Sequence, residues 1–283
     1  MRGLNLKEKL ILITGSTSGI GKATAIKLSK LGAHVIIHGR NEIKTRKTIE
    51  LIKNEISPAK IDGVYADLRS QEQIKEMVEK LYVKFDQLDV LINNAGVIRE
   101  KRTLTEEGLE ETFAVNYIAP FLLTNLLIDL LKKSKAGRIV NVASQVHSNH
   151  LDFNDLQYEK GYSGVKAYAR SKTCLIMFTY LLAEKLKKTN ITVNCLHPGI
   201  INTKLLEASM GAPVGAPVSI GAENLIYVAT NQKLKNVSGK YFNNKKQEFS
   251  KELTYDKEIQ KKLWKKTGKI LSTNFEIVNY YLA

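Results

Sequence analysis

The chain has 283 residues, a length that fits one large α/β domain or two smaller ones. Its composition, 43% hydrophobic and 25% charged, is typical of globular proteins. The net charge is +15, but the 43 lysines and arginines are scattered, with only a mild concentration near the C-terminus, which excludes a dedicated nucleic-acid site. We attribute the charge to a lysine-rich surface that keeps the protein soluble; attraction of an anionic cofactor or an anionic membrane surface is the alternative.

The cysteines, the N-terminus and the histidines narrow the class further. Cys174 and Cys195 fall in predicted buried elements and lack Cys-x-x-Cys spacing, so we expect two inert free thiols in a reducing compartment. Residues 1–9 contain no apolar signal region, and the apolar stretch 118–131 is too short and too polar to cross a bilayer. The five histidines form no His-x-x-x-His pair, so we predict no metal site. These features predict a cytoplasmic protein.

Strand and helix patterns alternate almost throughout the chain. In chain order, the predicted elements are strand 10–14, helix 20–31, strand 34–38, helix 42–56, strand 61–66, helix 71–85, strand 89–92, one or two helices in 104–133 with a bend near Pro120, strand 138–143, helix 165–188 and strand 191–196. This alternation predicts a parallel sheet covered by helices on both faces. With right-handed crossovers, it becomes a doubly wound α/β sheet, a three-layered Rossmann fold that forms a single domain over residues 1–283.

Three segments depart from this rhythm. Residues 145–164 form an insertion between a strand and a helix. Residues 200–221 contain a Gly-, Ala- and Pro-rich stretch and are predicted to form a mobile substrate loop. The C-terminal extension, 243–283, places apolar residues on one helical stripe: Tyr255, Ile259, Leu263 and Ile270. We expect this stripe to dock on the domain, and binding to an anionic membrane is the less favoured alternative.

A glycine-rich loop lies where the first predicted strand turns into the first helix. Its glycines, Gly15, Gly19 and Gly21, let the backbone approach a pyrophosphate, and the helix N-terminus offers free N–H groups to the negative charge. We assign cofactor binding to the whole loop: Gly15, Ser16, Thr17, Ser18, Gly19, Ile20 and Gly21. The spacing is Gly-x-x-x-Gly-x-Gly rather than the commoner Gly-x-Gly-x-x-Gly.

The end of the second strand selects between the two nicotinamide dinucleotides. An acidic residue there would bind the ribose 2′-hydroxyl, but this chain has none and offers Arg40, whose planar guanidinium suits a phosphate. We therefore predict NADP(H) rather than NAD(H); the alternative is that Arg40 only stacks on the adenine or faces solvent. Asp67 ends the third strand, where it could accept from the adenine amino group or cap the next helix.

Tyr168 and Lys172 lie four residues apart, which places a phenol and an ammonium on one helix face. A nearby ammonium favours the phenolate, so we expect it to lower the tyrosine pKa and make Tyr168 a proton donor or acceptor near neutral pH. Tyr162 and Lys166 repeat the spacing, but the glycines around Tyr162 place it at or before the helix start, so we favour Tyr168. Ser144 is a candidate carbonyl-binding serine at the end of the fifth strand, and Ser148, which lies further from the strand end, is a weaker rival.

The ordered motifs of this chain resemble those of the short-chain dehydrogenase/reductase family. They are Thr14-Gly15-x-x-x-Gly19-x-Gly21, Asn93-Asn94-Ala95-Gly96, Asn116, Ser144, Tyr168-x-x-x-Lys172, and Pro198-Gly199 with Thr203 beyond it. The long spacing between Ser144 and Tyr168, together with Asp155-Leu156, the segment 238–242 and Leu263-Trp264, resembles the retinol dehydrogenase-like subgroup, whose members generally prefer NADP(H).

The resemblance implies reversible hydride transfer between NADP(H) and an apolar aldehyde or ketone and its alcohol. It implies that Tyr168 is the general acid/base, that Lys172 holds the ribose and stabilises the phenolate, that Ser144 binds the reacting oxygen, and that Asn116 anchors a water chain. Further cofactor contacts carried over from the family are Asp67, Leu68, Asn94, Ala95, Gly96, Tyr168, Lys172, Pro198, Gly199, Ile201 and Thr203. A non-catalytic NADP(H)-binding regulator, or a reductase of a carbon–carbon double bond, is the alternative.

The substrate and partners follow less directly. Candidate pocket walls are the 145–164 insertion and apolar residues beyond the strand ends: Val97, Ile98, Leu205, Leu206 and Met210. The predicted helix 165–188 has an apolar outer side that includes Phe178 and Leu182, and related proteins often dimerise here. We therefore expect a homodimer that acts on a small apolar molecule.

Overall fold

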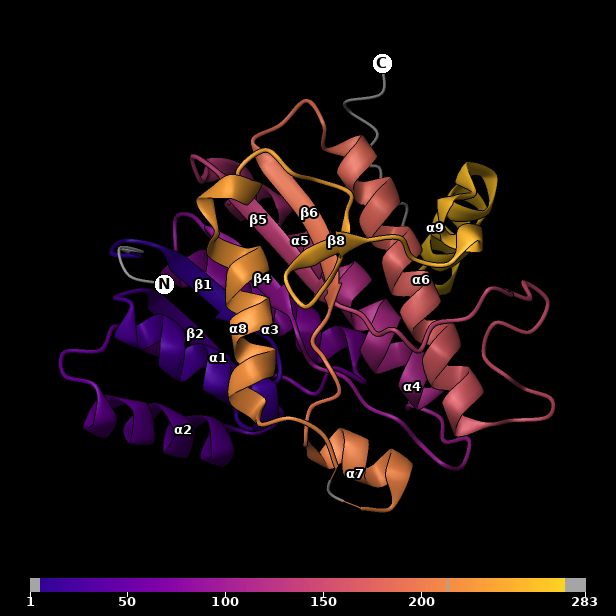
Figure 1. The fold of residues 1–283 in the computed structure, drawn as a ribbon, viewed down its shortest axis with the longest axis horizontal. Coiled ribbons are helices and arrows are strands. Elements are labelled where there is room, and N and C mark those ends of the chain that lie inside the picture. Colours follow the sequence, from indigo (N-terminus) through magenta and orange to yellow (C-terminus); the bar gives the residue numbers. More distant parts are fainter. Residues whose placement is uncertain (1–5, 213, 273–283) are drawn as a thin grey trace.

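The fold is known from a computed structural model, which describes residues 6–212 and 214–272 (Figure 1). Within this range one eight-stranded sheet has the order β3-β2-β1-β4-β5-β6-β7-β8. All neighbouring strands are parallel except the last pair. The strands are β1 (Leu10–Ile13), β2 (His34–Gly39), β3 (Ile61–Tyr65), β4 (Val90–Asn93), β5 (Gly137–Val142), β6 (Ile191–His197), β7 (Tyr241–Asn243) and β8 (Lys246–Glu248).

Helices cover both faces of the sheet, so that the fold has the three predicted layers (Figure 1). They are α1 (Gly19–Lys30), α2 (Glu42–Glu55), α3 (Gln71–Lys84), α4 (Glu111–Phe113), the π-helical turn η1 (Ala114–Ile118), α5 (Ala119–Lys133), α6 (Gly164–Lys185), α7 (Lys204–Met210), α8 (Val218–Thr230), the 3₁₀ turns η2 (Gln232–Leu234) and η3 (Glu252–Tyr255), and α9 (Lys257–Ile270). The predicted doubly wound Rossmann fold is therefore confirmed.

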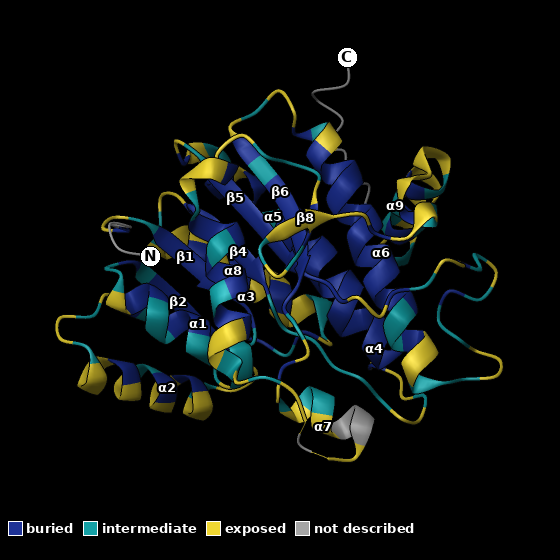
Figure 2. Ribbon diagram, viewed as in Figure 1, coloured by how far each residue is buried: buried dark blue, intermediate teal, exposed yellow. Residues whose placement is uncertain are grey.

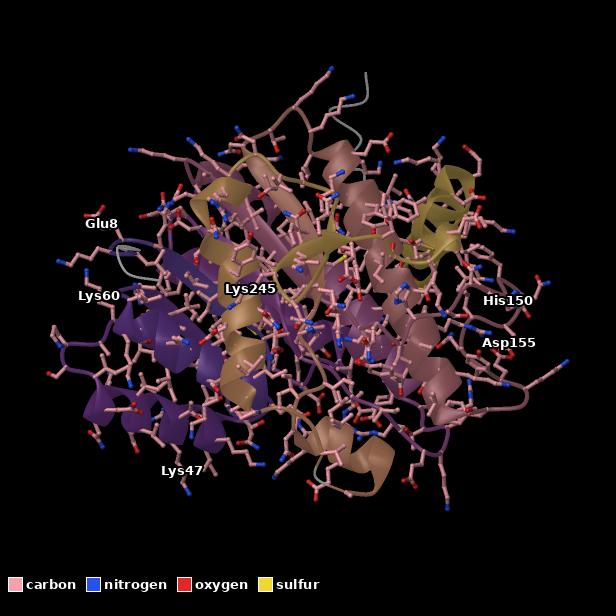
Figure 3. The ribbon with its side chains drawn as sticks, viewed as in Figure 1. Glu8, Lys47, Lys60, His150, Asp155 and Lys245 are labelled. Carbon is pink, nitrogen blue, oxygen red and sulfur yellow. The ribbon has the colours of Figure 1, made fainter. Side chains whose placement is uncertain are left out.

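The core lies between the sheet and its two helical layers. Alternate residues of a strand point to opposite faces, so that Leu12 packs with the α3, α5 and α6 side while Ile11 and Ile13 pack with the α1, α2 and α8 side. The central strands are buried along their whole length (Figure 2), whereas long charged side chains such as Lys47 and Lys60 project from the outer surface (Figure 3). The strand ends therefore sit on a rigid support.

The region expected to form helices from residue 104 differs from the prediction. Leu104 and Glu110 form an isolated antiparallel bridge, and helix begins only at Glu111. The expected bend at Pro120 is replaced by the π-helical turn η1, after which Pro120 occupies the first turn of α5, where a missing N–H is tolerated. The continuous helix 111–133 is long and apolar enough to span a membrane, but 89% of its apolar window is buried in the protein, as in a core helix.

Two of the three irregular segments contain more regular structure than their composition predicts. The 145–164 insertion contains no helix or strand before Gly164, as expected. The predicted mobile loop 200–221 contains α7 and the start of α8; residue 213 and the side chain of Met210 lie outside the described part. The C-terminal extension adds β8, η3 and α9, and residues 273–283 lie outside the described part.

Helix α9 packs beside α6 (Figure 1) and covers the apolar side on which the homodimer expectation rested. The Trp264 ring lies 5.8 Å from the Phe178 ring and 4.8 Å from the Phe121 ring, and Leu182 is fully buried. Leu263 is buried, and Ile259 packs against the same core. Docking of the apolar stripe on the domain is therefore confirmed, and Phe178 and Leu182 do not form an exposed dimer surface.

Candidate active site

A groove of about 830 Å³ opens at the carboxyl ends of the strands, where ligands bind in doubly wound sheets. Among the predicted cofactor residues, it is lined by Gly15, Thr17, Ser18, Gly19, Ile20, Gly21, Arg40, Asp67, Leu68, Asn94, Ala95, Gly96 and Thr203. Residues that the sequence did not single out for this site also line it: His38, Gly39, Lys44, Arg69, Arg99, Glu111, Val115, Asn202, Lys204 and Glu207. The predicted wall residues Val97, Ile98 and Leu205 belong to the same lining.

The glycine loop has the backbone geometry that its sequence predicts. Gly15 and Gly19 adopt φ values of +63° and +55°, a region that favours glycine. A Cβ on Gly21 would lie 2.5 Å from the Gly15 carbonyl oxygen, so only glycine fits there. Ser18, the N-cap of α1, makes no side-chain capping bond, which leaves the first N–H groups of the helix available to an anion. The loop thus fits a dinucleotide pyrophosphate.

Hydrogen bonds from neighbouring strands hold this loop in place. The Thr14 hydroxyl accepts the N–H groups of Asn94 and Ala95 at 2.9 and 3.0 Å, and the Asn94 amide donates to the Thr14 carbonyl oxygen at 2.8 Å. His38 Nδ1 accepts the Gly15 N–H at 3.1 Å, and burial lowers the pKa of His38 to about 4, which keeps the ring neutral. The sequence analysis missed His38, since a lone histidine in a strand carries no motif.

Ser16 differs from the other residues of the loop. Its side chain is fully buried and donates to the Ile13 carbonyl oxygen at 2.8 Å, while its oxygen accepts the His38 N–H at 2.9 Å. Ser16, which we predicted as a cofactor residue together with the rest of the loop, does not belong to the groove lining. Ser16 instead fixes the first strand to the second strand below the loop, because a small hydroxyl fits between two backbones.

The adenosine end of the groove carries several charges. Arg40 and Lys44 line it with exposed side chains. Arg69 donates to the Asp67 carboxylate at 2.7 Å. Burial raises the pKa of Asp67, but the Arg69 hydrogen bonds outweigh it and hold that pKa below 3.8. The N-cap of α3 is Ser70, not Asp67, so the alternative capping role of Asp67 is wrong.

Tyr168, Lys172 and Ser144 converge beside the groove. Tyr168 and Lys172 lie on α6, and the Tyr168 side chain forms a hydrogen bond with Ser144, which follows β5. The Lys172 ammonium lies 5.5 Å from the centre of the Tyr168 ring, and its Nζ would lie 3.5 Å from a Cβ on groove residue Gly96. The two predicted sites therefore meet at Gly96.

The pKa of Tyr168 does not shift in the direction that its spacing from Lys172 predicts. Burial raises the pKa of Tyr168 above 10.0, although the hydrogen bond from Ser144 opposes this. Burial also lowers the pKa of Lys172 from 10.5 to about 7, and its Nζ donates to the Val142 carbonyl oxygen at 2.8 Å. The prediction of a lowered tyrosine pKa is wrong because burial of Tyr168 itself outweighs the influences that lower its pKa.

Asn116 lies in η1, directly behind this cluster. Its Oδ1 accepts the Val97 N–H at 2.8 Å, and its Nδ2 donates to the Val97 carbonyl oxygen at 2.9 Å and to the Ser171 hydroxyl at 3.1 Å. The side chain therefore fixes the chain beyond Gly96 to α6. Both the oxygen and the nitrogen of the Asn116 side chain have protein partners, and the water chain stays a prediction.

The competing residues lie away from the cluster. The Tyr162 hydroxyl donates to the Arg99 carbonyl oxygen and the Glu110 carboxylate, each at 3.1 Å, and Tyr162 precedes α6. Lys166 is exposed. The Ser148 hydroxyl donates to the His150 carbonyl oxygen at 2.9 Å. Each of these side chains has a structural partner of its own or faces solvent, so none of them belongs to the cluster of Tyr168, Lys172 and Ser144.

Tyr168 and Lys172 do not belong to the groove lining, and neither do the remaining predicted contacts. Pro198, Gly199 and Ile201 follow β6, and the Ile201 side chain is buried.

The two cysteines are buried and free, and burial raises the pKa of each thiol to about 12, which confirms that they are inert.

Residues 9–212 match the family model of short chain dehydrogenases. A human polyprenol dehydrogenase is 38% identical over 277 residues, which cover 92% of this chain and 84% of that protein. Human retinol dehydrogenase 13 is 34% identical over 279 residues, with 93% and 84% covered, and mouse retinol dehydrogenase 14 is 38% identical over 279 residues, with 90% and 84% covered.

Solved structures agree with these relatives. A crystal structure of an uncharacterized protein from Mycobacterium paratuberculosis superposes with a TM-score of 0.79 at 25% identity and covers 96% of both chains. A short chain dehydrogenase from Escherichia coli CFT073, solved with NADPH, has a TM-score of 0.71 at 26% identity and covers 86% of this chain and 99% of that chain. The family match, the relatives and the solved structures agree with the glycine loop, the groove and the side chains beside it. This chain belongs to the short-chain dehydrogenase/reductase family, as a retinol dehydrogenase-like oxidoreductase.

Proposed function

We propose that this protein is an NADP(H)-dependent oxidoreductase that interconverts an apolar aldehyde or ketone with the corresponding alcohol. The observation that carries the proposal is that Tyr168 lies with Ser144 and Lys172 in one cluster, whose Lys172 Nζ lies beside Gly96 in the lining of a groove that fits a dinucleotide. A non-catalytic regulator would need none of these three side chains together.

The chain's own residues account for the proton and for the orientation of the substrate. In the direction of reduction, Ser144 donates a hydrogen bond to the carbonyl oxygen, and Tyr168 donates its proton to the same oxygen. The nicotinamide of NADPH, when bound, supplies the hydride to the carbonyl carbon. Lys172 stabilises the phenolate that remains and holds the ribose hydroxyls. In alcohol oxidation the Tyr168 phenolate takes the proton of the alcohol, and the hydride moves to NADP⁺.

The choice of NADP(H) rests on the cationic adenosine end of the groove. Arg40 and Lys44 line this end, and the carboxylate of Asp67, also in the lining, is neutralised by Arg69. Arg40→Ala should raise the Kd of NADPH about 10- to 150-fold and leave that of NADH within about twofold, since a charge-assisted phosphate contact is worth about 1.5–3 kcal/mol. Equal changes for both cofactors, measured by fluorescence titration, would show that Arg40 does not select the phosphate.

The apolar character of the substrate is supported by the pocket walls and the relatives. Val97, Ile98 and Leu205 contribute apolar side chains to the lining of the groove. The relatives are named for retinol and polyprenol, which are long apolar alcohols. We therefore propose an apolar isoprenoid-like alcohol or aldehyde as the substrate class, to be tested against a panel of aldehydes, ketones and alcohols by NADPH absorbance.

The central test is Tyr168→Phe, with Tyr162→Phe as the matched control. Loss of the Tyr168 hydroxyl removes the proton donor, so kcat should fall by about 10²–10⁴-fold, while NADPH binding is retained. The Tyr162→Phe variant should keep its activity. Substantial carbonyl reduction by the Tyr168→Phe variant would remove Tyr168 from its assigned role, and reduction of a carbon–carbon double bond alone would favour the alternative reductase.

A further inference from the structure

The loop that follows Ser144 is held from two sides. On one side, the Ser148 N–H donates to the Thr173 hydroxyl of α6 at 2.7 Å, one residue beyond Lys172. On the other side, His147 connects the loop to the C-terminal extension, and His147 is itself 6% exposed. The Ser144 hydroxyl accepts the Val146 N–H at 3.0 Å, so the direction of this hydroxyl depends on the backbone of the loop.

His147 uses both of its ring nitrogens. Its Nε2 accepts the backbone N–H of Lys251 at 2.9 Å, which requires an unprotonated nitrogen there. The proton therefore resides on Nδ1, which donates to the Ser144 carbonyl oxygen at 2.9 Å. Burial lowers the pKa of His147, which favours this neutral form. One ring thus joins the backbone of Ser144 to the backbone of Lys251.

The far end of this link is itself firmly placed. Ser250, which precedes Lys251, is buried, and its hydroxyl lies 2.7 Å from the Tyr180 hydroxyl of α6 and 2.6 Å from that of Thr254. The Ser250 N–H donates to the Tyr255 hydroxyl at 3.1 Å. Lys251 therefore presents its N–H from a fixed position rather than from a free tail.

Two further contacts join the same segments. The Leu253 N–H donates to the Asn149 side chain at 3.0 Å, and the Lys262 ammonium lies 4.4 Å from the centre of the Phe153 ring. His150 and Asp155 of the insertion lie on the same side of the molecule as α9 (Figures 1 and 3). The segment 250–270 lies beyond the residues matched by the family model, yet it contacts the loop that carries the catalytic serine.

We propose that His147 is a positioning residue through which the C-terminal extension holds Ser144 in its reactive orientation. The inference rests on the proposed role of Ser144 in binding the reacting oxygen. It makes residues near Lys251 part of the support of the active site, although they touch neither groove nor substrate.

Lys251→Pro isolates the link, because it removes the N–H that His147 accepts. Lys251 has a φ of −62°, a value that proline adopts without strain. Lys257→Pro is the matched control: it makes the same change at the first residue of α9, where a missing N–H is tolerated. Lys251→Ala keeps the N–H and reports the contribution of the side chain alone.

We expect kcat of the Lys251→Pro variant to fall about tenfold, since small misplacements of a catalytic group cost up to about 10²-fold. The Kd of NADPH should stay within about twofold, since the groove is unchanged. In a Ser144→Ala background, Lys251→Pro should cost no further activity, because the link acts through Ser144. Lys257→Pro should keep the wild-type kcat, and Lys251→Ala should lose less than Lys251→Pro.

Two substitutions of His147 test the link without proline. Asn places an amide nitrogen near the Nδ1 position and keeps the bond to Ser144, whereas Gln keeps an acceptor near Nε2 for Lys251. Each breaks one half of the link, so both should lower kcat as Lys251→Pro does.

The outcomes separate this inference from the proposed function. Wild-type kcat in Lys251→Pro and in both His147 variants, with a large loss in Ser144→Ala, would overturn the positioning role alone. An equal loss from Lys251→Pro with and without Ser144 would also overturn it, since the effect would then be structural. Wild-type activity of Ser144→Ala would overturn the role of Ser144 and this inference together.

Discussion

Lys172 is expected to cost the protein stability, and replacing it by methionine should reveal how much. The side chain is 3% exposed, and burial lowers its pKa from 10.5 to about 7. At about 1.4 kcal/mol per pH unit, this fall corresponds to a penalty of about 5 kcal/mol for the buried ammonium. Lys172→Met also loses the hydrogen bond to the Val142 carbonyl oxygen, and this loss destabilises the protein by about 1–3 kcal/mol. The net gain for Lys172→Met is therefore about 3 kcal/mol.

The sign of the pH dependence follows from the lowered pKa. Below pH 7, Lys172 is charged in both the folded and the unfolded state, so the penalty is present in full. Between about pH 7 and pH 10.5 the folded state loses its proton first, and the penalty fades. The wild-type protein should therefore gain stability relative to Lys172→Met as the pH rises through this window.

Thermal unfolding of the cofactor-free protein from pH 6 to pH 10 measures this effect. At pH 6 the Tm of Lys172→Met should exceed that of the wild type by about 6–12 °C, at roughly 2–4 °C per kcal/mol, and the difference should vanish or reverse near pH 10. Lys166→Met, at an exposed position of the same helix, should show no such trend. A Lys172→Met variant that is less stable at every pH, by a constant amount, would refute the reasoning, although its activity is lost in either case.

Three further perturbations test the groove, a buried carboxylate and the C-terminal helix. In Gly21→Ala, a Cβ 2.5 Å from the Gly15 carbonyl oxygen should weaken NADPH binding about tenfold or more, given a repacking cost of about 1–3 kcal/mol. The control Gly108→Asn, at a position with open space around it, should leave the Kd of NADPH unchanged. Burial raises the pKa of Asp89, but hydrogen bonds to its carboxylate outweigh burial and hold that pKa below 3.8. Asp89→Asn should therefore lower the urea midpoint at pH 7, and the difference from the wild type should disappear as the pH falls through the folded-state pKa. A loss of stability that does not depend on pH would contradict this prediction. Trp264→Ala should destabilise the protein by about 2–4 kcal/mol and expose the apolar side of α6; an unchanged urea midpoint together with an unchanged sedimentation coefficient would show that α9 does not cover that side.

The sequence alone determined the fold class, and it predicted the residues that we propose to be reactive. Apolar strands and amphipathic helices alternate with periods that the backbone imposes, and parallel crossovers leave few ways to arrange them. The glycines at 15, 19 and 21 could be interpreted because only glycine permits the backbone to bend and approach in this way. Tyr168 and Lys172 could be paired because a helix brings residues four apart onto one face.

Only the tertiary structure decided the features that depend on contacts between distant segments. His38, Ser16 and His147 carry no motif, and their roles arise from hydrogen bonds to residues of other strands and of the C-terminal extension. The covering of α6 by α9 could not be read from either helix, since an apolar side does not specify what packs on it. The pKa values of Tyr168 and Lys172 likewise depend on burial, which local spacing does not contain, and this is why the direction predicted for the Tyr168 pKa is wrong.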